Sequence, residues 1–193
     1  MKKLGTILGI IAVVAVIGFR IYLKIKPRVA KDAFATAVLA INETDFNYDL
    51  TYAVSTDLKR EITYENGTYT KNAPANYVEY VKKNKVPKID EIITKVKGIS
   101  YPDPAFKPII IRSLDYLNAT KKIYETDMVK LAEMKDKNAT AEEIKKFQDE
   151  IKPKDNTILN QKREALYEVA LPFADKNEIE YSKGFGGRIM MKF

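Results

Sequence analysis

The 193-residue chain contains no cysteine and no histidine. Their absence excludes Ser-His-Asp and Cys-His nucleophile systems, thiolate redox chemistry and the usual zinc sites. Carboxylate chemistry remains, but adjacent residues on a helix point apart, so neighbouring acids are best explained as solvated faces. These neighbours are Glu142 with Glu143, Asp149 with Glu150, and Asp45 with Asp49. We therefore expect a protein that is not an enzyme and that needs no cofactor or metal.

Acidic residues are absent from the first thirty positions, and this explains the net charge of +7. Six of the 33 Lys and Arg residues lie there, and the other 27 nearly balance the 26 Asp and Glu residues. Nucleic-acid binding requires a basic face on the folded body, and these charges predict a nearly neutral body. We expect no nucleic-acid partner.

The N-terminal sequence MKKLGTILGIIAVVAVIGFRIYLKIKPR has an apolar run over residues 4–23. About twenty residues of helix span roughly 30 Å, the thickness of a bilayer core, so we expect a transmembrane helix in contact with lipid. The flanking basic residues and one tyrosine suit the membrane interface, where they meet anionic headgroups. These residues are Lys2, Lys3, Arg20, Tyr22, Lys24, Lys26 and Arg28.

Two alternatives to a retained signal-anchor over residues 1–28 remain. Cleavage after Gly18 would make the run a secretory signal, but residues 19–24 continue the apolar character. A buried helix of a soluble core normally has one polar face, and this segment is apolar all round.

The charge count at the C-terminal flank favours a cytoplasmic body, whereas the short Met-Lys-Lys start is typical of an exported one. We expect a single-pass protein of the inner (cytoplasmic) membrane with an extracytoplasmic C-terminal domain.

Residues 29–193 predict one extramembrane α+β domain. Helical spacing of apolar residues indicates a helix over 29–42, and alternation then predicts a strand that begins near residue 46. Asn66-Gly67 between β-forming residues indicates a hairpin, so 46–71 is expected to form a three-stranded antiparallel meander. Four of its tyrosines would form a face for a ligand or partner: Tyr48, Tyr52, Tyr64 and Tyr69.

Helical patterns return over 74–98, where short helices are expected, with Pro87 opening one that ends at Gly98. Residues 103–176 predict an antiparallel helical hairpin whose arms begin at an Asp103 cap and at a Thr140–Glu143 capping box. Pro153 is expected to kink or break the second arm. The first apolar stripe is Ile110, Leu114, Leu117, Tyr124, Met128 and Leu131, and the second is Ile144, Phe147, Ile151, Ile158, Ala165 and Val169.

Residues 177–193 alternate again and contain Gly184, Gly186 and Gly187, which predicts a C-terminal β-hairpin. We expect this hairpin to extend the 46–71 sheet, with the helical hairpin inserted between them as a second layer.

These features favour a non-enzymatic membrane-anchored envelope protein that binds or positions a partner protein, or a second copy of itself, at the membrane surface. The alternative is a membrane-tethered module that binds a lipid or peptidoglycan fragment in a tyrosine-lined pocket. A carboxylate-dependent hydrolase would require two acidic side chains that face each other in a cleft.

Overall fold

In a computed structural model of the protein, the described residues are 28–44, 47–54, 62–65, 68–71, 76–184 and 187–192, with the backbone alone at 62–65 and 68–71. No helix within these ranges is long and apolar enough to cross a membrane. The segment 4–23 and the predicted interface residues Lys2 to Lys26 lie outside them.

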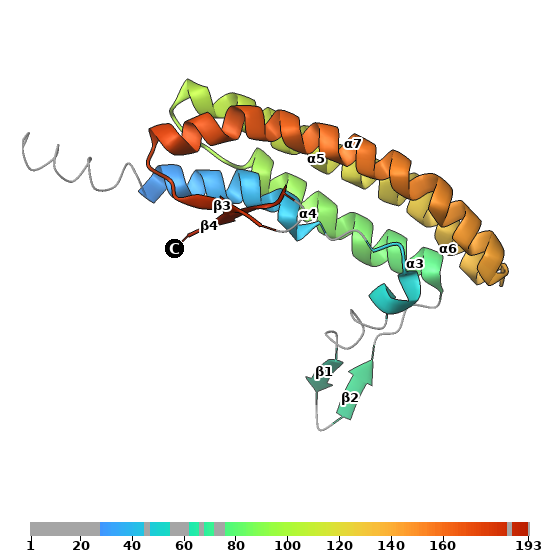
Figure 1. The fold of residues 1–193 in the computed structure, drawn as a ribbon. Helices are drawn as coiled ribbons and strands as arrows, with labels where there is room; N and C mark the ends of the chain where they lie inside the picture. The colour runs from blue at the N-terminus through green and yellow to red at the C-terminus, as the bar shows by residue number, and fades with distance from the viewer. Residues whose placement is uncertain are drawn as a thin grey trace, which may run out of the picture.

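The body is mostly helical, with one small antiparallel β-hairpin near the C-terminus, so the α+β prediction is correct only in part (Figure 1). A helix over residues 28–38 continues into the 3-10 helix η1. The labelled helical segments, in chain order, are η1 Leu39–Glu43, α3 Tyr77–Tyr80, η2 Val81–Lys85, α4 Val86–Lys97, η3 Pro104–Phe106, α5 Lys107–Ile123, η4 Tyr124–Met128, α6 Val129–Asp136 and α7 Ala141–Lys176.

The predicted helical hairpin is confirmed: α5, η4 and α6 form one arm and α7 the other (Figure 1). Asp103 caps the first arm by accepting a hydrogen bond from the Ala105 N–H. Thr140 and Glu143 form the expected capping box at the start of α7. Gly98 ends α4 as predicted, although α4 follows η2 without a break.

The second half of the α7 stripe lies one residue later than predicted. Phe147 and Ile151 are buried as expected, but the buried positions then continue through Asp155 and Leu159, while Ile158 is 37% exposed. The predicted stripe passed from Ile151 to Ile158 and did not include Asp155. Steps of four residues keep one helix face inward, which explains why Leu159 is buried.

Pro153 does not break α7, contrary to one of the two outcomes expected for it. The helix is continuous over 36 residues and curves gently in Figure 1. An internal proline costs about 3 kcal/mol, whereas each large apolar side chain that is buried contributes roughly 1.5–3 kcal/mol. Ile151 and Leu159 are buried on either side of Pro153, and their packing outweighs the lost hydrogen bond.

Aromatic packing joins the helix over 28–38 to the C-terminal end of α7. The Phe34 and Phe173 rings stack with centroids 6.5 Å apart, and Phe106 meets Phe173 edge to face at 5.1 Å. Tyr101 packs edge to face against both Phe106 and Phe173. Phe34 has no exposed surface, so this helix belongs to the core.

The predicted C-terminal hairpin is confirmed as β3 Tyr181–Lys183 paired antiparallel with β4 Ile189–Met191. Gly187, at φ +75°, takes the left-handed conformation in the connection. The hairpin does not extend another sheet, as the described strands form two separate two-stranded sheets. It packs on helices instead, because Asn42 Nδ2 donates to the Ile189 carbonyl and the Ile189 N–H donates to Tyr167 Oη.

The predicted three-stranded meander is wrong in its first strand. Residues 50–54 are helical, while β1 Ile62–Glu65 and β2 Thr68–Lys71 form the hairpin that Asn66-Gly67 predicted. Asp49 Oδ1 accepts hydrogen bonds from the Thr51 and Tyr52 N–H groups, which is typical of a helix N-terminus. This local cap outweighs the alternating pattern.

The corrected α7 register predicts different stabilities for two neighbouring substitutions. Leu159→Ala should lower the free energy of unfolding by about 2–5 kcal/mol because it leaves a cavity in the core. Ile158→Ala, at a more exposed site, should cost under about 1 kcal/mol. Urea unfolding of both variants in an uncharged detergent measures the difference, and equal losses would contradict the register.

Candidate functional site

Tyr48 connects the segment before helix 50–54 to α7. Its hydroxyl donates a hydrogen bond to Asp155 Oδ2 over 3.1 Å, and its carbonyl accepts one from Gln148 Nε2 over 2.8 Å. Lys152 Nζ lies 5.6 Å from the centroid of the Tyr48 ring, within cation–π range. Three residues of one α7 face therefore hold Tyr48 in place.

Asp155 is a carboxylic acid with no exposed surface. Burial raises the pKa of this carboxyl from 3.8 to about 6, the Tyr48 hydrogen bond opposes that rise, and Asp127 adds to it. Lys154 bridges the two acids, with Nζ 2.6 Å from Asp127 Oδ2 and 3.8 Å from Asp155 Oδ1. Burial and the Asp155 charge in turn raise the pKa of the Tyr48 hydroxyl.

In the polar cluster of Tyr48, Asp127, Lys154 and Asp155, Tyr48 and Asp155 are buried, whereas the Lys154 side chain is half exposed. Asp127 lies on the π-helical segment η4, which packs against the other π-helical segment, η2. π segments are frequent at functional sites because they change the direction of side chains along a helix. Two acidic side chains do face each other here, but Asp155 has no surface that a substrate could reach without a movement of the chain.

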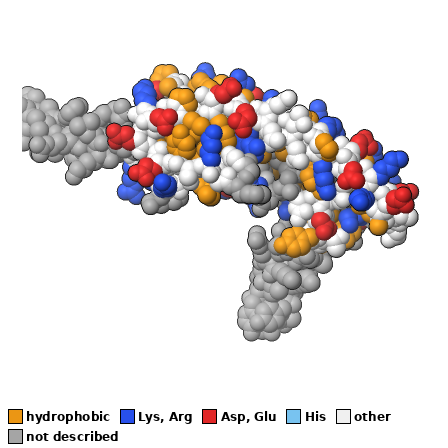
Figure 2. Space-filling model, viewed as in Figure 1, with side chains coloured by type: hydrophobic (Ala, Val, Ile, Leu, Met, Phe, Trp, Pro, Cys, Tyr) orange, Lys and Arg blue, Asp and Glu red, His pale blue; other side chains and the backbone are white. Residues whose placement is uncertain are grey.

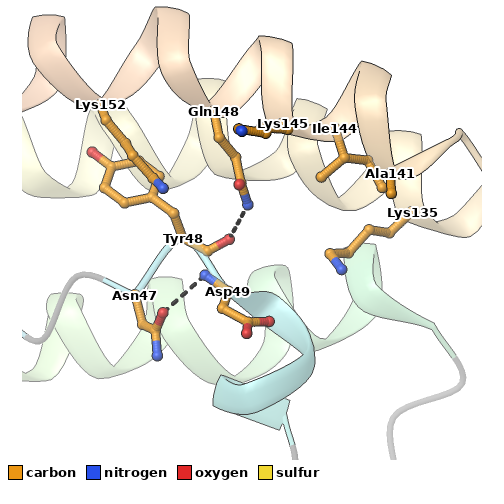
Figure 3. Close-up of a pocket in the computed structure, with 9 residues that line it drawn as sticks. All are labelled: Asn47, Tyr48, Asp49, Lys135, Ala141, Ile144, Lys145, Gln148 and Lys152. Carbon is orange, nitrogen blue, oxygen red and sulfur yellow. Dashed lines mark hydrogen bonds between the residues drawn. The ribbon is translucent and has the colours of Figure 1, made fainter.

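An open groove of about 470 Å³ lies beside Tyr48, between residues 47–49 and the first third of α7 (Figure 3). Nine described residues line it: Asn47, Tyr48, Asp49, Lys135, Ala141, Ile144, Lys145, Gln148 and Lys152. Three of them are lysines, and Asp49 is the one acid among the nine. We call this feature the lysine groove.

No ion pair among the described residues joins a lysine of the groove to a carboxylate. Lys135 Nζ donates a hydrogen bond to Thr51 Oγ1 over 2.9 Å. The Asp49 carboxylate accepts backbone N–H groups, as described above, and Asn47 Oδ1 accepts the Asp49 N–H. The lysine groove therefore carries a local excess of positive charge on a body that is nearly neutral as a whole.

The structure places the predicted tyrosines in different surroundings. Tyr48 is 8% exposed and lines the lysine groove, whereas Tyr52 on helix 50–54 is 61% exposed. Tyr64 and Tyr69 are directly opposite each other in the β1–β2 register. Of the predicted membrane-interface residues, Arg28 alone is described, and it is exposed at the start of the described chain.

The sequence reading missed Asp155 and the three groove lysines. Asp155 had a visible signal, because it lies midway between Ile151 and Leu159 at steps of four residues. The lysines had none, since they gather only when residues 47–49 fold against α7 and α6.

Comparisons with known proteins give no indication of function, so the function must be inferred from the sequence and this geometry. No family model matches the chain, and no match was found among curated proteins or solved structures. The described residues contain no group of three or more acidic side chains placed to hold a metal ion.

The buried carboxyl predicts a pH-dependent stability. The folded pKa of Asp155 lies above its ordinary value, so its contribution is full below about pH 4 and is lost as the pH rises through about 6. At 1.36 kcal/mol per pKa unit, the change is on the order of 3 kcal/mol. Asp155→Asn cannot titrate, so its stability relative to the wild type should rise by that amount between pH 4 and 7.5.

Urea unfolding of both proteins across this pH range, followed by circular dichroism, measures the difference. Carboxylates that do not interact with Asp155 titrate equally in both proteins and cancel. A difference that stays constant with pH would contradict a raised pKa at Asp155.

Proposed function

We propose that the protein is a non-enzymatic, single-pass membrane protein of the cell envelope that binds or positions a partner protein at the membrane surface. This proposal rests on the apolar run over residues 4–23 with its basic flanks, which is long enough to span a bilayer core. The body after it is nearly balanced in charge, and Figure 2 shows acidic and basic side chains intermixed on the visible face. Lipid, reached through residues 4–23, is its first partner.

The arrangement of the body suits a tether at one end. The helix over 28–38 is the first described element after the apolar run, and its Phe34 stacks on Phe173 near the end of α7. The turn between α6 and α7 lies at the opposite end (Figure 1). Because α7 has 36 residues at about 1.5 Å each, roughly 50 Å separate the two ends. A partner could therefore be held well beyond the lipid headgroups.

Export of the body is the orientation we propose, in line with the Met-Lys-Lys start.

The alternative function, a tethered module for a lipid or peptidoglycan fragment, draws support from Tyr48, which lines the lysine groove. The other lining side chains favour charge recognition over a tyrosine-lined pocket, so partner binding remains the first proposal.

Membrane attachment gives a direct test. The full chain should stay with the membrane pellet after alkaline extraction. Ile10→Asp with Val13→Asp should release it, because each charge at a bilayer centre costs about 2.5–3.5 kcal/mol. Lys88→Asp with Lys146→Asp is the control and should leave the chain in the pellet. Full-length protein that is soluble without detergent would contradict the tether.

Orientation and partner binding need separate measurements. A C-terminal reporter enzyme that works only outside the cytoplasm should be active, and activity solely from a cytoplasmic reporter would contradict export.

The chain has no cysteine, so a single one introduced at exposed Ile111 or Met190 directs a cross-linker to one position. Cross-linked products in intact membranes should contain a second protein or a second copy, and an unmodified monomer at both positions would contradict partner binding.

A further inference from the structure

We propose that the lysine groove binds an acidic segment of the partner protein, with Lys135, Lys145 and Lys152 pairing with its carboxylates. This inference rests on the proposed function, because it names the chemistry by which the tethered body would recognise its partner. The three ammonium groups project from α6 and α7 into one groove (Figure 3). They are not neutralised by ion pairs within the described residues, so a carboxylate ligand would gain contacts without displacing any such pair.

The dimensions of the groove fit a short peptide. Its α7 wall extends from Ala141 to Lys152, twelve residues that span about 17 Å of helix. About five residues of extended chain span the same length. Ala141 and Ile144 supply apolar surface between the charges, which suits a peptide that alternates acidic and aliphatic side chains.

The spacing of the cations favours carboxylates spread along a peptide over one compact phosphate, because Lys145 and Lys152 lie seven residues, or about 10 Å, apart on α7. No arginine is among the nine lining residues, so the planar fork that binds carboxylate or phosphate in a bidentate manner is missing from this site. The start of α7 is occupied by its own capping box, in which Glu143 accepts the Thr140 N–H over 2.8 Å. That carboxylate would repel any anion from the helix N-terminus, which leaves the groove lysines as the anion site.

The position of the groove also favours a protein partner over the headgroups of the tethering membrane. Gln148 lies 28 residues before the end of α7, which is about 40 Å of helix. Because helix 28–38 packs at that end, the groove lies far from the point at which the body joins its anchor.

The test uses the full chain in uncharged detergent micelles and a fluorescein-labelled peptide, Gly-Glu-Leu-Glu-Leu-Glu-Gly. Fluorescence anisotropy should show saturable binding that weakens as salt rises from 50 to 300 mM, because salt screens charge pairs. The same peptide with Gln in place of Glu should bind at least tenfold more weakly. Inorganic phosphate and a short-chain anionic phospholipid serve as competitors.

Matched charge reversals locate the site. Lys145→Glu with Lys152→Glu should weaken peptide binding at least tenfold, and Lys145→Gln with Lys152→Gln should weaken it less. Lys88→Glu with Lys146→Glu changes the net charge equally outside the groove and should leave binding within twofold of the wild type. Circular dichroism checks that each variant is folded.

Equal weakening by both glutamate pairs would overturn the proposal, since it would mean binding to net charge alone. Displacement of the peptide by phosphate or the phospholipid at lower concentration than by unlabelled peptide would also overturn it and would assign the groove to a phosphate-bearing ligand. If the peptide does not bind while membrane attachment and cross-linking are retained, the groove assignment is wrong and the proposed function still stands. Loss of membrane attachment with intact peptide binding would do the reverse.

Discussion

The packing of one long helix, α7, is the constraint on which the rest of the described structure depends. Its N-terminal third holds Tyr48, its middle faces η4, and its C-terminal third carries Phe173 and Tyr167. Through these residues it reaches the helix over 28–38, the α5–α6 arm and the C-terminal hairpin. A helix of 36 residues gains most of its stability from such tertiary contacts, so one face of α7 must stay inward along its whole length.

That requirement explains why a polar residue sits in the core. Asp155 occupies a stripe position, and a buried carboxyl is costly unless it is hydrogen-bonded. Tyr48 supplies a hydrogen bond, Lys154 lies nearby, and the raised pKa reduces the cost by favouring the neutral acid. The same contacts fix the backbone at residues 47–49 as one wall of the lysine groove. A core interaction thus shapes the surface that we assign to partner binding.

Local signals in the sequence predicted much of the fold. The Asp103 cap, the Thr140–Glu143 box and Gly98 each depend on a few neighbouring residues, and each lies where it was expected. The strands on either side of Asn66-Gly67 pair as that dipeptide predicted. Patterns whose outcome depends on distant contacts predicted the structure less well. Alternation suggested a strand at 50–54, but the Asp49 cap and the packing of Leu50 made a helix there.

The site was less predictable than the fold, for the same reason. Tyr48 was chosen as a member of a strand face, and it does line the groove, but from a different element and beside different neighbours. The buried stripe of α7 shifts by one residue because a charged residue, Asp155, takes an inward position. A carboxyl at a stripe position becomes acceptable only when a tyrosine from another part of the chain reaches it, and no local pattern shows that.

Hydrogen exchange along α7, measured amide by amide, tests the dependence on this helix most directly. If α7 is the common packing element, its buried amides on both sides of Pro153 should report one opening free energy, the same as that of the buried amides of α5. Residues 141–152 that exchange much faster, as an independent unit, would contradict a single helix that holds Tyr48, η4 and the C-terminal hairpin together.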